Sequence, residues 1–285
     1  DATFANGRVA ALQSTANVRS YGLIGATDCS AVIQLATNSG RSNKYNFRGN
    51  FKVDVPTQTT GISNLTLDCH GAYFDCSDMY GADVKNDIDA LFRMAGSEYG
   101  STSLSVAAVE HEYTITVTDG TKIKEGAELE ITSDQHWYTS TISIGRRFIA
   151  TAKNVTGNVV TLFQPLPFDF AIAGQTTVVA SWDQIENINI LGGHFFGGNW
   201  RRNIGNGIGI GVSQISYARN VVIKDFNADG FEGIAYRADS VCNYKVTDGY
   251  IRGHADDFGT VTEALNSGFY GVFMRHYVKC VWLKK

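Results

Sequence analysis

Four short stretches of alternating apolar and polar residues recur along the chain, and each one follows an asparagine. The asparagines are Asn64, Asn187, Asn220 and Asn243, and the stretches read SNLTLDCHGAYF (63–74), ENINILGGHFFG (186–197), RNVVIKDFNADG (219–230) and CNYKVTDGYIRG (242–253). The last two intervals between the asparagines are 33 and 23 residues. Repeats of this length that bury their apolar face against neighbouring repeats are typical of a solenoid. The pattern predicts an all-β chain folded as a parallel β-helix.

A helix is expected ahead of the first repeat. Asp28 is a good N-terminal cap, Val32, Leu35 and Ala36 fall on one helical face, and Gly40 can end the helix. A short amphipathic helix here would cover the first, unpaired edge of the solenoid, and natural folds protect such edges. The sequence therefore predicts an N-terminal capping helix.

The 123 residues between Asn64 and Asn187 are too many for one coil. Strands are expected at YTITVTD (113–119) and AELEITS (127–133), followed by a hairpin, RRFIATAKNV and GNVVTLFQPL, that closes between Asn154 and Asn158. We predict that residues 1–83 form the cap and first coil, residues 84–182 a small inserted antiparallel barrel or sandwich, and residues 183–285 further coils. Because the final YVKCVWLKK reads as a strand without a following turn, we expect the solenoid to be incomplete at that end.

Composition narrows the classes of function. Thirty glycines against three prolines suit many tight turns between short strands. The formal charge of −4 argues against nucleic acid or an anionic membrane as the main partner. No apolar run reaches the ~20 residues that span a bilayer, and the first residues do not read as a secretory signal peptide. The five cysteines lack metal-ligand spacing, so we expect reduced core residues and no metal or other cofactor.

The stretch NVRSYGLIGATDCSAVIQLATNSGRSNKYNFRGNFKV (17–53) resembles the opening of pectate-lyase-like bacteriophage tailspikes, which has an fGA…tDdtaAiq segment, a plug helix and a G-x-y-x-v strand. YTITVTDGTKIKEGAELEITSD and GNVVTLFQPLPFDF resemble the small β domain of such tailspikes, and ENINILGG the nVtI coil after it. The resemblance covers nearly the whole chain; DCSA replaces the usual double-aspartate start, a departure that touches only the cap. It implies a right-handed β-helix in a homotrimer that binds and cleaves a bacterial surface polysaccharide. It also implies a virion location, with the rest of the phage tail attached through a part outside this chain.

Aligning the coils on their asparagines places candidate catalytic residues in one column. Positions 12 to 14 residues after Asn187, Asn220 and Asn243 hold Asn199, Trp200 and Arg201; Glu232, Gly233 and Ile234; and Ala255, Asp256 and Asp257. Neighbouring parallel strands lie ~4.8 Å apart, so these positions should line one flank, with Asp229 nearby. A glycosidase uses one carboxylic acid to protonate the leaving oxygen and a second carboxylate to activate water or attack the sugar. The predicted catalytic residues are Glu232, Asp256, Asp257 and Asp229.

The predicted substrate-binding residues surround this column. Trp200 offers an apolar face to a sugar ring, and Arg201 and Arg202 can hold an acidic or acetylated sugar in a forked hydrogen bond. Tyr236, Arg237 and His254 complete the set. Each single aspartate also has a structural explanation, because Asp and Asn favour solenoid turns. Glutamate is not a turn residue, which singles out Glu232.

We therefore expect an endo-acting glycoside hydrolase whose substrate is a bacterial capsular polysaccharide or O-antigen. The alternative is a polysaccharide lyase, in which His254, Tyr236 or Lys279 abstracts a proton beside a uronic-acid carboxylate and Arg237 neutralises that carboxylate. A third hypothesis is a non-catalytic spike that uses the same flank only to bind. Elimination leaves an ultraviolet-absorbing sugar, and a spike that only binds leaves polymer length unchanged.

Overall fold

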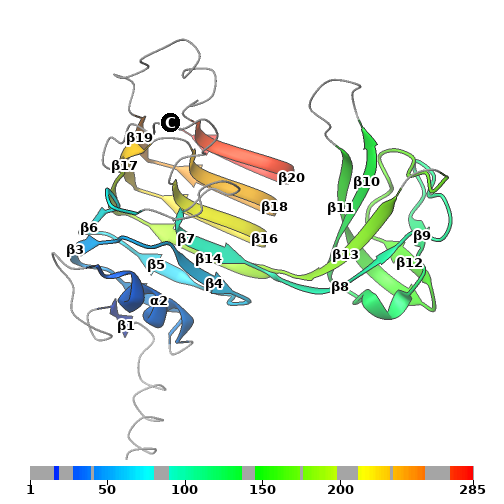
Figure 1. Cartoon of the computed structure of the whole chain (residues 1–285), viewed down its shortest axis with the longest axis horizontal. Coiled ribbons are helices and arrows are strands. Elements are labelled where there is room, and N and C mark those ends of the chain that lie inside the picture. Colours follow the sequence, from blue (N-terminus) through cyan, green and yellow to red (C-terminus); the bar gives the residue numbers. More distant parts are fainter. Residues whose placement is uncertain are drawn as a thin grey trace, which may run out of the picture. The chain divides into compact units, whose positions relative to one another are not determined.

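The computed structural model describes residues 16–18, 28–39, 42–79, 90–136, 145–173, 176–197, 211–231, 234–253 and 270–284. The chain divides into two compact units (Figure 1). The larger unit combines residues 1–95 with residues 185–285, and the smaller unit is the segment 96–184.

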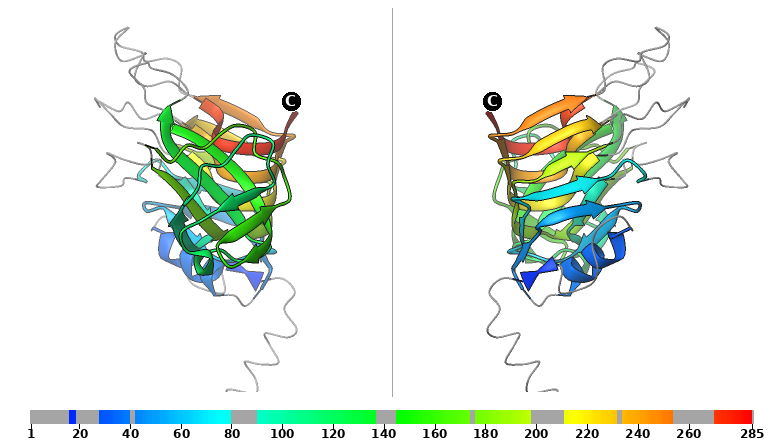
Figure 2. Two further views of the ribbon diagram at one scale, coloured as in Figure 1. Left: turned by 90° about the vertical axis from the view of Figure 1, so that its right-hand side faces the viewer. Right: turned by 90° about the vertical axis from the view of Figure 1, so that its left-hand side faces the viewer.

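The larger unit contains three stacks of parallel strands. The first stack comprises β1 (Ala16–Asn17), β2 (Lys44–Asn46), β5 (Thr66–Asp68), β14 (Ile185–Leu191) and the C-terminal halves of β16 (Gly211–Lys224), β18 (Ile234–Thr247) and β20 (Tyr270–Lys284). The second comprises β3 (Gly49–Lys52), β6 (Ala72–Asp75), β15 (His194–Phe196), β17 (Asn227–Phe231) and β19 (Tyr250–Gly253). The third comprises β4 (Thr57–Thr60), β7 (Ala90–Ala95) and the N-terminal halves of β16, β18 and β20. These sheets curl partly round an axis (Figures 1 and 2).

The four asparagines of the sequence repeat form a hydrogen-bonded ladder along the first stack. All four have a φ of 57–58°, the left-handed region that asparagine tolerates better than most residues. Asn187 Nδ2 donates to Asn64 Oδ1 at 2.8 Å, Asn220 Nδ2 to Asn187 Oδ1 at 3.1 Å, and Asn243 Nδ2 to Asn220 Oδ1 at 2.9 Å. The apolar residues one and three positions after each asparagine are buried, as in Ile188 and Ile190. The prediction that these asparagines begin equivalent parallel strands is confirmed.

Asn220 lies in the middle of this ladder, and replacing it by alanine should destabilise the larger unit. Alanine loses both amide hydrogen bonds and strains the left-handed backbone by about 1–2 kcal/mol. We expect the free energy of unfolding to fall by about 2–3 kcal/mol, measured by denaturant unfolding. Asn220→Gly removes the same bonds without the strain and should cost less. Equal losses for the two variants would contradict a contribution from the backbone conformation.

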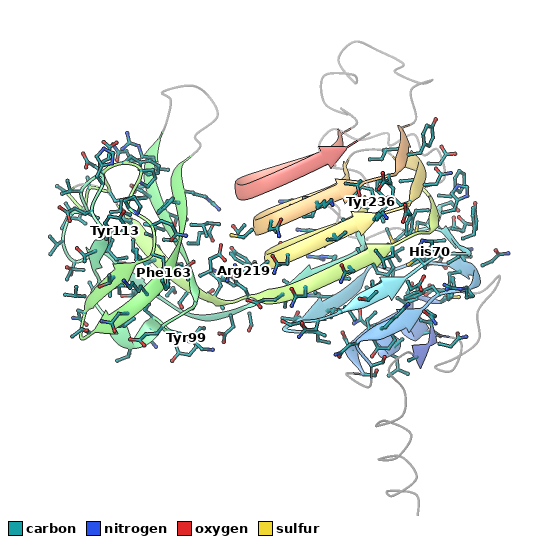
Figure 3. All side chains as sticks on the ribbon, turned by 180° about the vertical axis from the view of Figure 1, so that it is seen from behind. His70, Tyr99, Tyr113, Phe163, Arg219 and Tyr236 are labelled. Atoms are coloured by element: carbon teal, nitrogen blue, oxygen red, sulfur yellow. The ribbon has the colours of Figure 1, made fainter. Side chains whose placement is uncertain are left out.

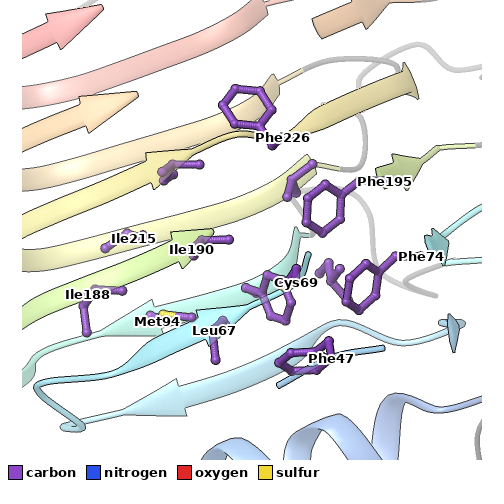
Figure 4. Close-up of a cluster of buried hydrophobic side chains, with 14 of the residues drawn as sticks. Phe47, Leu67, Cys69, Phe74, Met94, Ile188, Ile190, Phe195, Ile215 and Phe226 are labelled. Atoms are coloured by element: carbon purple, nitrogen blue, oxygen red, sulfur yellow. The ribbon is translucent and has the colours of Figure 1, made fainter. Parts of the chain in front are cut away.

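The three stacks share one apolar core. Phe51, Phe74 and Phe195 of the second stack lie one above another, with ring centroids 5.1 and 5.0 Å apart and planes within 18° and 13° of parallel. Phe92 of the third stack meets Phe74 and Phe195 edge-on at 5.9 and 6.3 Å. The first stack contributes side chains such as Ile190 (Figure 4). Dense aromatic packing of this kind holds the strands of different stacks in fixed positions.

Helix α2 (Ser30–Asn38) forms where the sequence predicts a helix, but with a different buried face. Asp28 Oδ1 accepts a hydrogen bond from the Ser30 backbone N–H at 2.9 Å, in keeping with its predicted capping role. The buried side chains include Ile33 and Ala36, whereas Leu35 is 58% exposed, so the predicted face was wrong. The contact with β4 explains the difference: the Gln34 side-chain amide bonds both backbone groups of Gln58 on this edge strand. The role of α2 as a cap stays a prediction.

The smaller unit is an antiparallel barrel. Its strands follow the order β8 (Ser97–Ser103), β13 (Thr177–Asp183), β10 (Glu128–His136), β11 (Gly145–Thr156), β12 (Val159–Leu162) and β9 (Thr114–Thr116), with the short helix η2 (Gly120–Lys122) after β9. A bridge between Leu104 and Val117 joins the two ends of this sheet and closes it. The β11–β12 hairpin turns at Gly157 and Asn158, where the sequence predicts it. The small barrel is thus a self-contained β unit.

The small barrel interrupts the solenoid at a single corner. Ala95, at the end of β7, pairs with Ser216, and Ile185, at the start of β14, pairs with Ala218. In that next coil the corner between the two pairing positions is one residue, Tyr217, with a φ of 50°. Since β7 pairs in parallel with β4 and β16, the residues of β7 belong to the solenoid even though they fall in the predicted 84–182 range.

This geometry predicts that one residue can replace the whole segment 96–184. A glycine or asparagine between Ala95 and Ile185 would reproduce the left-handed corner seen at Tyr217. We expect the shortened chain to keep a cooperative thermal transition and a β-sheet circular dichroism spectrum. A valine at the same junction is the matched control and should lower the melting temperature, because β-branched residues resist positive φ. A shortened chain that fails to fold with either glycine or asparagine would contradict the prediction.

Candidate functional site

The outward face of the second stack carries two columns of functional side chains, here called the outer ladder. One column is Tyr73, His194, Asn227 and Tyr250, and the other is Asp75, Phe196 and Asp229, each in register on β6, β15, β17 and β19. Alternate residues of the same strands, Phe74, Phe195 and Ala228, point into the core. Strand alternation therefore holds the outer ladder against a rigid aromatic support.

Aromatic rings make up much of the outer ladder. The rings of Tyr73 and His194 meet edge-on with centroids 5.1 Å apart, and those of Tyr73 and Phe196 are nearly parallel at 6.5 Å. These three side chains are half-buried, while Tyr250 is 57% exposed. Rings with one buried and one accessible side present flat apolar surface to a ligand.

Two carboxylates flank Phe196 in the second column. Asp75 and Asp229 are one strand apart on either side of β15, so their backbone positions are separated by about 9.6 Å, twice the strand spacing. Asp75 Oδ1 accepts a hydrogen bond from the Ser77 backbone N–H at 3.0 Å. Burial raises the pKa of Tyr73, and the charges of Asp75, Cys76 and Asp229 raise it further. Both carboxylates therefore act on the same phenol.

A charged cluster stabilises the turn that leads into the outer ladder. The Asp68 carboxylate lies 3.1 Å from Lys44 Nζ, 3.4 Å from Arg48 Nη1 and 2.9 Å from His70 Nδ1. Burial acts to raise the pKa of Asp68, but the hydrogen bonds from His70, Lys44 and Arg48 outweigh it and hold the pKa well below its ordinary value. The cluster orients the chain between β5 and β6.

Asp68→Asn should therefore destabilise the fold in a pH-dependent way. A lowered folded-state pKa contributes stability above the unfolded pKa of about 3.9, and this is lost as the pH falls towards the folded value. We expect the variant to lose roughly 1–3 kcal/mol of unfolding free energy at pH 7. The difference from the original chain should shrink below pH 4 in denaturant titrations. A difference that is the same at pH 7 and pH 2.5 would contradict this assignment.

The structure separates the predicted site residues that it describes. Asp229 lies in the outer ladder, as just described. Tyr236 is fully buried, with its ring 4.6 Å from that of Phe226 (Figure 3), which does not fit the predicted contact with substrate. Arg237 is 3% exposed and belongs to the third stack. The other predicted residues fall outside the described residues: Glu232, Asp256, Asp257, Trp200, Arg201, Arg202 and His254.

Sequence alignment on the asparagines missed Tyr73, Asp75, His194 and Phe196. Tyr73 comes nine residues after its asparagine, whereas His194, Asn227 and Tyr250 come seven residues after theirs. The turn between β5 and β6 is thus two residues longer than its counterparts, and a fixed offset cannot align it. Aligning the alternating pattern of the second strand in each coil would have found the column.

Within the described ranges, no cluster of three or more His, Cys, Asp or Glu side chains is arranged to hold a metal ion. In the same ranges no helix is long and apolar enough to cross a membrane. Cys29, Cys69 and Cys76 are free thiols in the core.

Comparison with known proteins identifies the architecture. No protein-family model and no curated protein sequence matches the chain. Among solved structures, the Gp54 tailspike of Acinetobacter baumannii bacteriophage AP22, in complex with an A. baumannii capsular saccharide, shares 14% identity over 82% of this chain and 46% of its own, with a TM-score of 0.52. The tailspike gp49 of Pseudomonas phage LKA1 shares 14% identity over 80% of this chain and 36% of its own, at 0.56. The tailspike gp61 of Pseudomonas phage phi297 shares 14% over 86% and 44%, at 0.58. The chain has a tailspike-like fold and spans less than half the length of these structures.

Proposed function

We propose that this chain is the polysaccharide-processing part of a phage tailspike, which binds a bacterial capsular polysaccharide or O-antigen and hydrolyses it at the surface of the host cell. The observation that carries the proposal is the outer ladder, where stacked aromatic rings flank two carboxylates on a rigid parallel sheet. The tailspike-like fold supports it, since one structural neighbour was solved with a capsular saccharide. A closed right-handed β-helix, a homotrimer and attachment to the virion tail are parts of the same proposal.

The two components of the outer ladder have different roles in this proposal. The rings of Tyr73, Phe196 and Tyr250 stack against the apolar faces of sugar rings and hold the polymer across successive coils. Asp229 supplies carboxylate chemistry at the glycosidic bond. Glu232, Asp256 and Asp257 stay predicted members of the catalytic set, and Trp200, Arg201, Arg202, Arg237 and His254 of the binding set.

The lyase alternative finds less support among the described residues. A tyrosine base needs access to the substrate and a lowered pKa. Burial instead holds the pKa of Tyr236 well above its ordinary value near 10. This leaves His254 or Lys279 to abstract the proton in a lyase.

Polymer cleavage can be tested directly. The chain is incubated with a panel of purified capsular and O-antigen polysaccharides, and polymer length is followed by size-exclusion chromatography with light scattering. We expect one or more polymers to shorten without new ultraviolet absorbance. Shortening with new absorbance would support the lyase, and binding without shortening would support the non-catalytic spike.

A matched pair of variants tests the binding surface. Tyr250 in the outer ladder and Tyr113 in the small barrel are 57% and 51% exposed. Tyr250→Ala should weaken binding to the cleaved polysaccharide about tenfold, or ~1.4 kcal/mol, in isothermal titration with an uncleavable oligosaccharide. Tyr113→Ala should leave the affinity unchanged. Equal effects of the two substitutions would count against the outer ladder as the binding surface.

A further inference from the structure

We propose that Asp75 and Asp229 form the acid–base pair of an inverting glycoside hydrolase. This inference rests on the proposed function and goes further, because it assigns a second catalytic residue, Asp75, and the stereochemical outcome of the reaction. It is argued from the register of the second stack and the surroundings of the two carboxylates.

The register sets the spacing of the pair. Phe196 pairs with Asp75 on one side and with Asp229 on the other, so β15 alone separates the two carboxylate-bearing strands. Two strand spacings of ~4.8 Å put the backbone positions about 9.6 Å apart. Carboxyl groups about 6.5–9.5 Å apart leave room for a water molecule and are typical of inverting enzymes, whereas retaining pairs are ~5–5.5 Å apart. Residues on directly neighbouring strands would be spaced for retention.

Competing carboxylates near the outer ladder are engaged elsewhere. Asp68 contacts Lys44, Arg48 and His70 at the turn before β6. Asp78 lies 2.7 Å from Lys52 Nζ. Among the described residues of the outer ladder itself, the carboxylates are Asp75 and Asp229.

The surroundings assign a role to each member. Asp75 accepts the Ser77 backbone N–H at 3.0 Å and lies beside Lys52 in register, and both groups complement a negative charge. Asp75 is therefore the general base that activates water. Asp229 is the general acid, and Tyr73 and Phe196 form the apolar surface between the two sites.

The reaction balances with water as the only co-reactant. Protonated Asp229 donates its proton to the glycosidic oxygen, the bond from that oxygen to the anomeric carbon breaks, and the electron pair leaves with the oxygen. Asp75 takes a proton from a water molecule as the water oxygen bonds to the anomeric carbon from the opposite face. The new reducing end has inverted configuration, and solvent returns one proton from Asp75 to Asp229 for the next cycle.

The test is proton NMR of the first reducing ends formed from a polysaccharide that the chain cleaves, recorded before mutarotation. We expect the anomeric configuration to be opposite to that of the cleaved linkage. Asp75→Asn should lower the turnover number by about 10²–10⁴-fold while affinity for the oligosaccharide persists. The asparagine Oδ1 can still accept the Ser77 N–H, so the turn is preserved, and a melting curve checks this.

The possible failures of this inference and of the proposed function are distinguishable. Retained configuration, or an Asp75→Asn variant with turnover within threefold of the original chain, would overturn the pair and leave a hydrolase with another site. No shortening of any polymer in the panel would overturn the proposed function itself. Inversion together with loss of turnover in the folded Asp75→Asn variant would establish the pair.

Discussion

Asp229→Asn is expected to reduce polysaccharide cleavage by about 10²–10⁴-fold while leaving binding in place. Asparagine keeps the shape of the side chain but neither donates a proton at neutral pH nor carries a negative charge. The ring surface formed by Tyr73 and Phe196 is unchanged by the substitution. The measurement is the initial rate of new reducing ends, with affinity for an uncleavable oligosaccharide determined in parallel.

Asp248→Asn is the matched control for this variant. Asp248 is an exposed aspartate at a left-handed turn with a φ of 54°, away from the columns of the outer ladder, and asparagine tolerates the same backbone conformation. Its rate should match that of the original chain. Glu232→Gln tests the competing prediction from the sequence. If Glu232→Gln abolishes cleavage while Asp229→Asn is as active as the control, the chemistry is centred on Glu232 and the outer ladder only binds.

The second large effect concerns stability. Phe195 is fully buried, stacked on Phe74 and in edge contact with Phe92, so Phe195→Ala removes ring contacts that connect two stacks. Truncating a buried phenylalanine typically costs about 3–5 kcal/mol of unfolding free energy. We expect a loss in this range by denaturant unfolding and a melting temperature several degrees lower.

The neighbouring ring provides an internal control. Phe196 follows Phe195 in the chain but points to the outer ladder, where it is half-buried. Phe196→Ala should cost much less stability and should weaken polysaccharide binding, the reverse of the effects of Phe195→Ala. If both variants lose the same stability and the same affinity, the two faces of β15 do not have the separate roles assigned here.

The asparagine ladder was predictable because one residue type satisfies two local requirements. Asparagine tolerates positive φ and offers an amide that bonds to its equivalents on neighbouring coils, so its spacing marks the coils directly in the sequence. The hairpin at Gly157 and Asn158 was predictable for a similar reason, because its turn residues lie between alternating strands.

Other features depend on contacts that no local pattern records. The phase of α2 is set by Gln34 on the edge of β4, and so Leu35 faces outwards although it fits an apolar stripe. β7 belongs to the solenoid because of pairing with β16, more than a hundred residues later in the chain. Asp75 was missed because a turn two residues longer displaces it from the fixed offset. Tertiary pairing decides these positions.

The single-residue corner has a consequence for how an entire domain can be exchanged. β8 and β13, the first and last strands of the small barrel, pair with each other, with Ser97 opposite Asp183, so the barrel needs its ends close together. A corner that joins adjacent backbone positions meets this requirement for any domain with neighbouring termini. The entropy of closing such an insertion grows only slowly with its length. The same left-handed corner recurs at Ser240, with a φ of 55°. The solenoid thus offers a series of equivalent sockets, and a tailspike-like scaffold can acquire, lose or relocate an accessory domain without redesigning its coils.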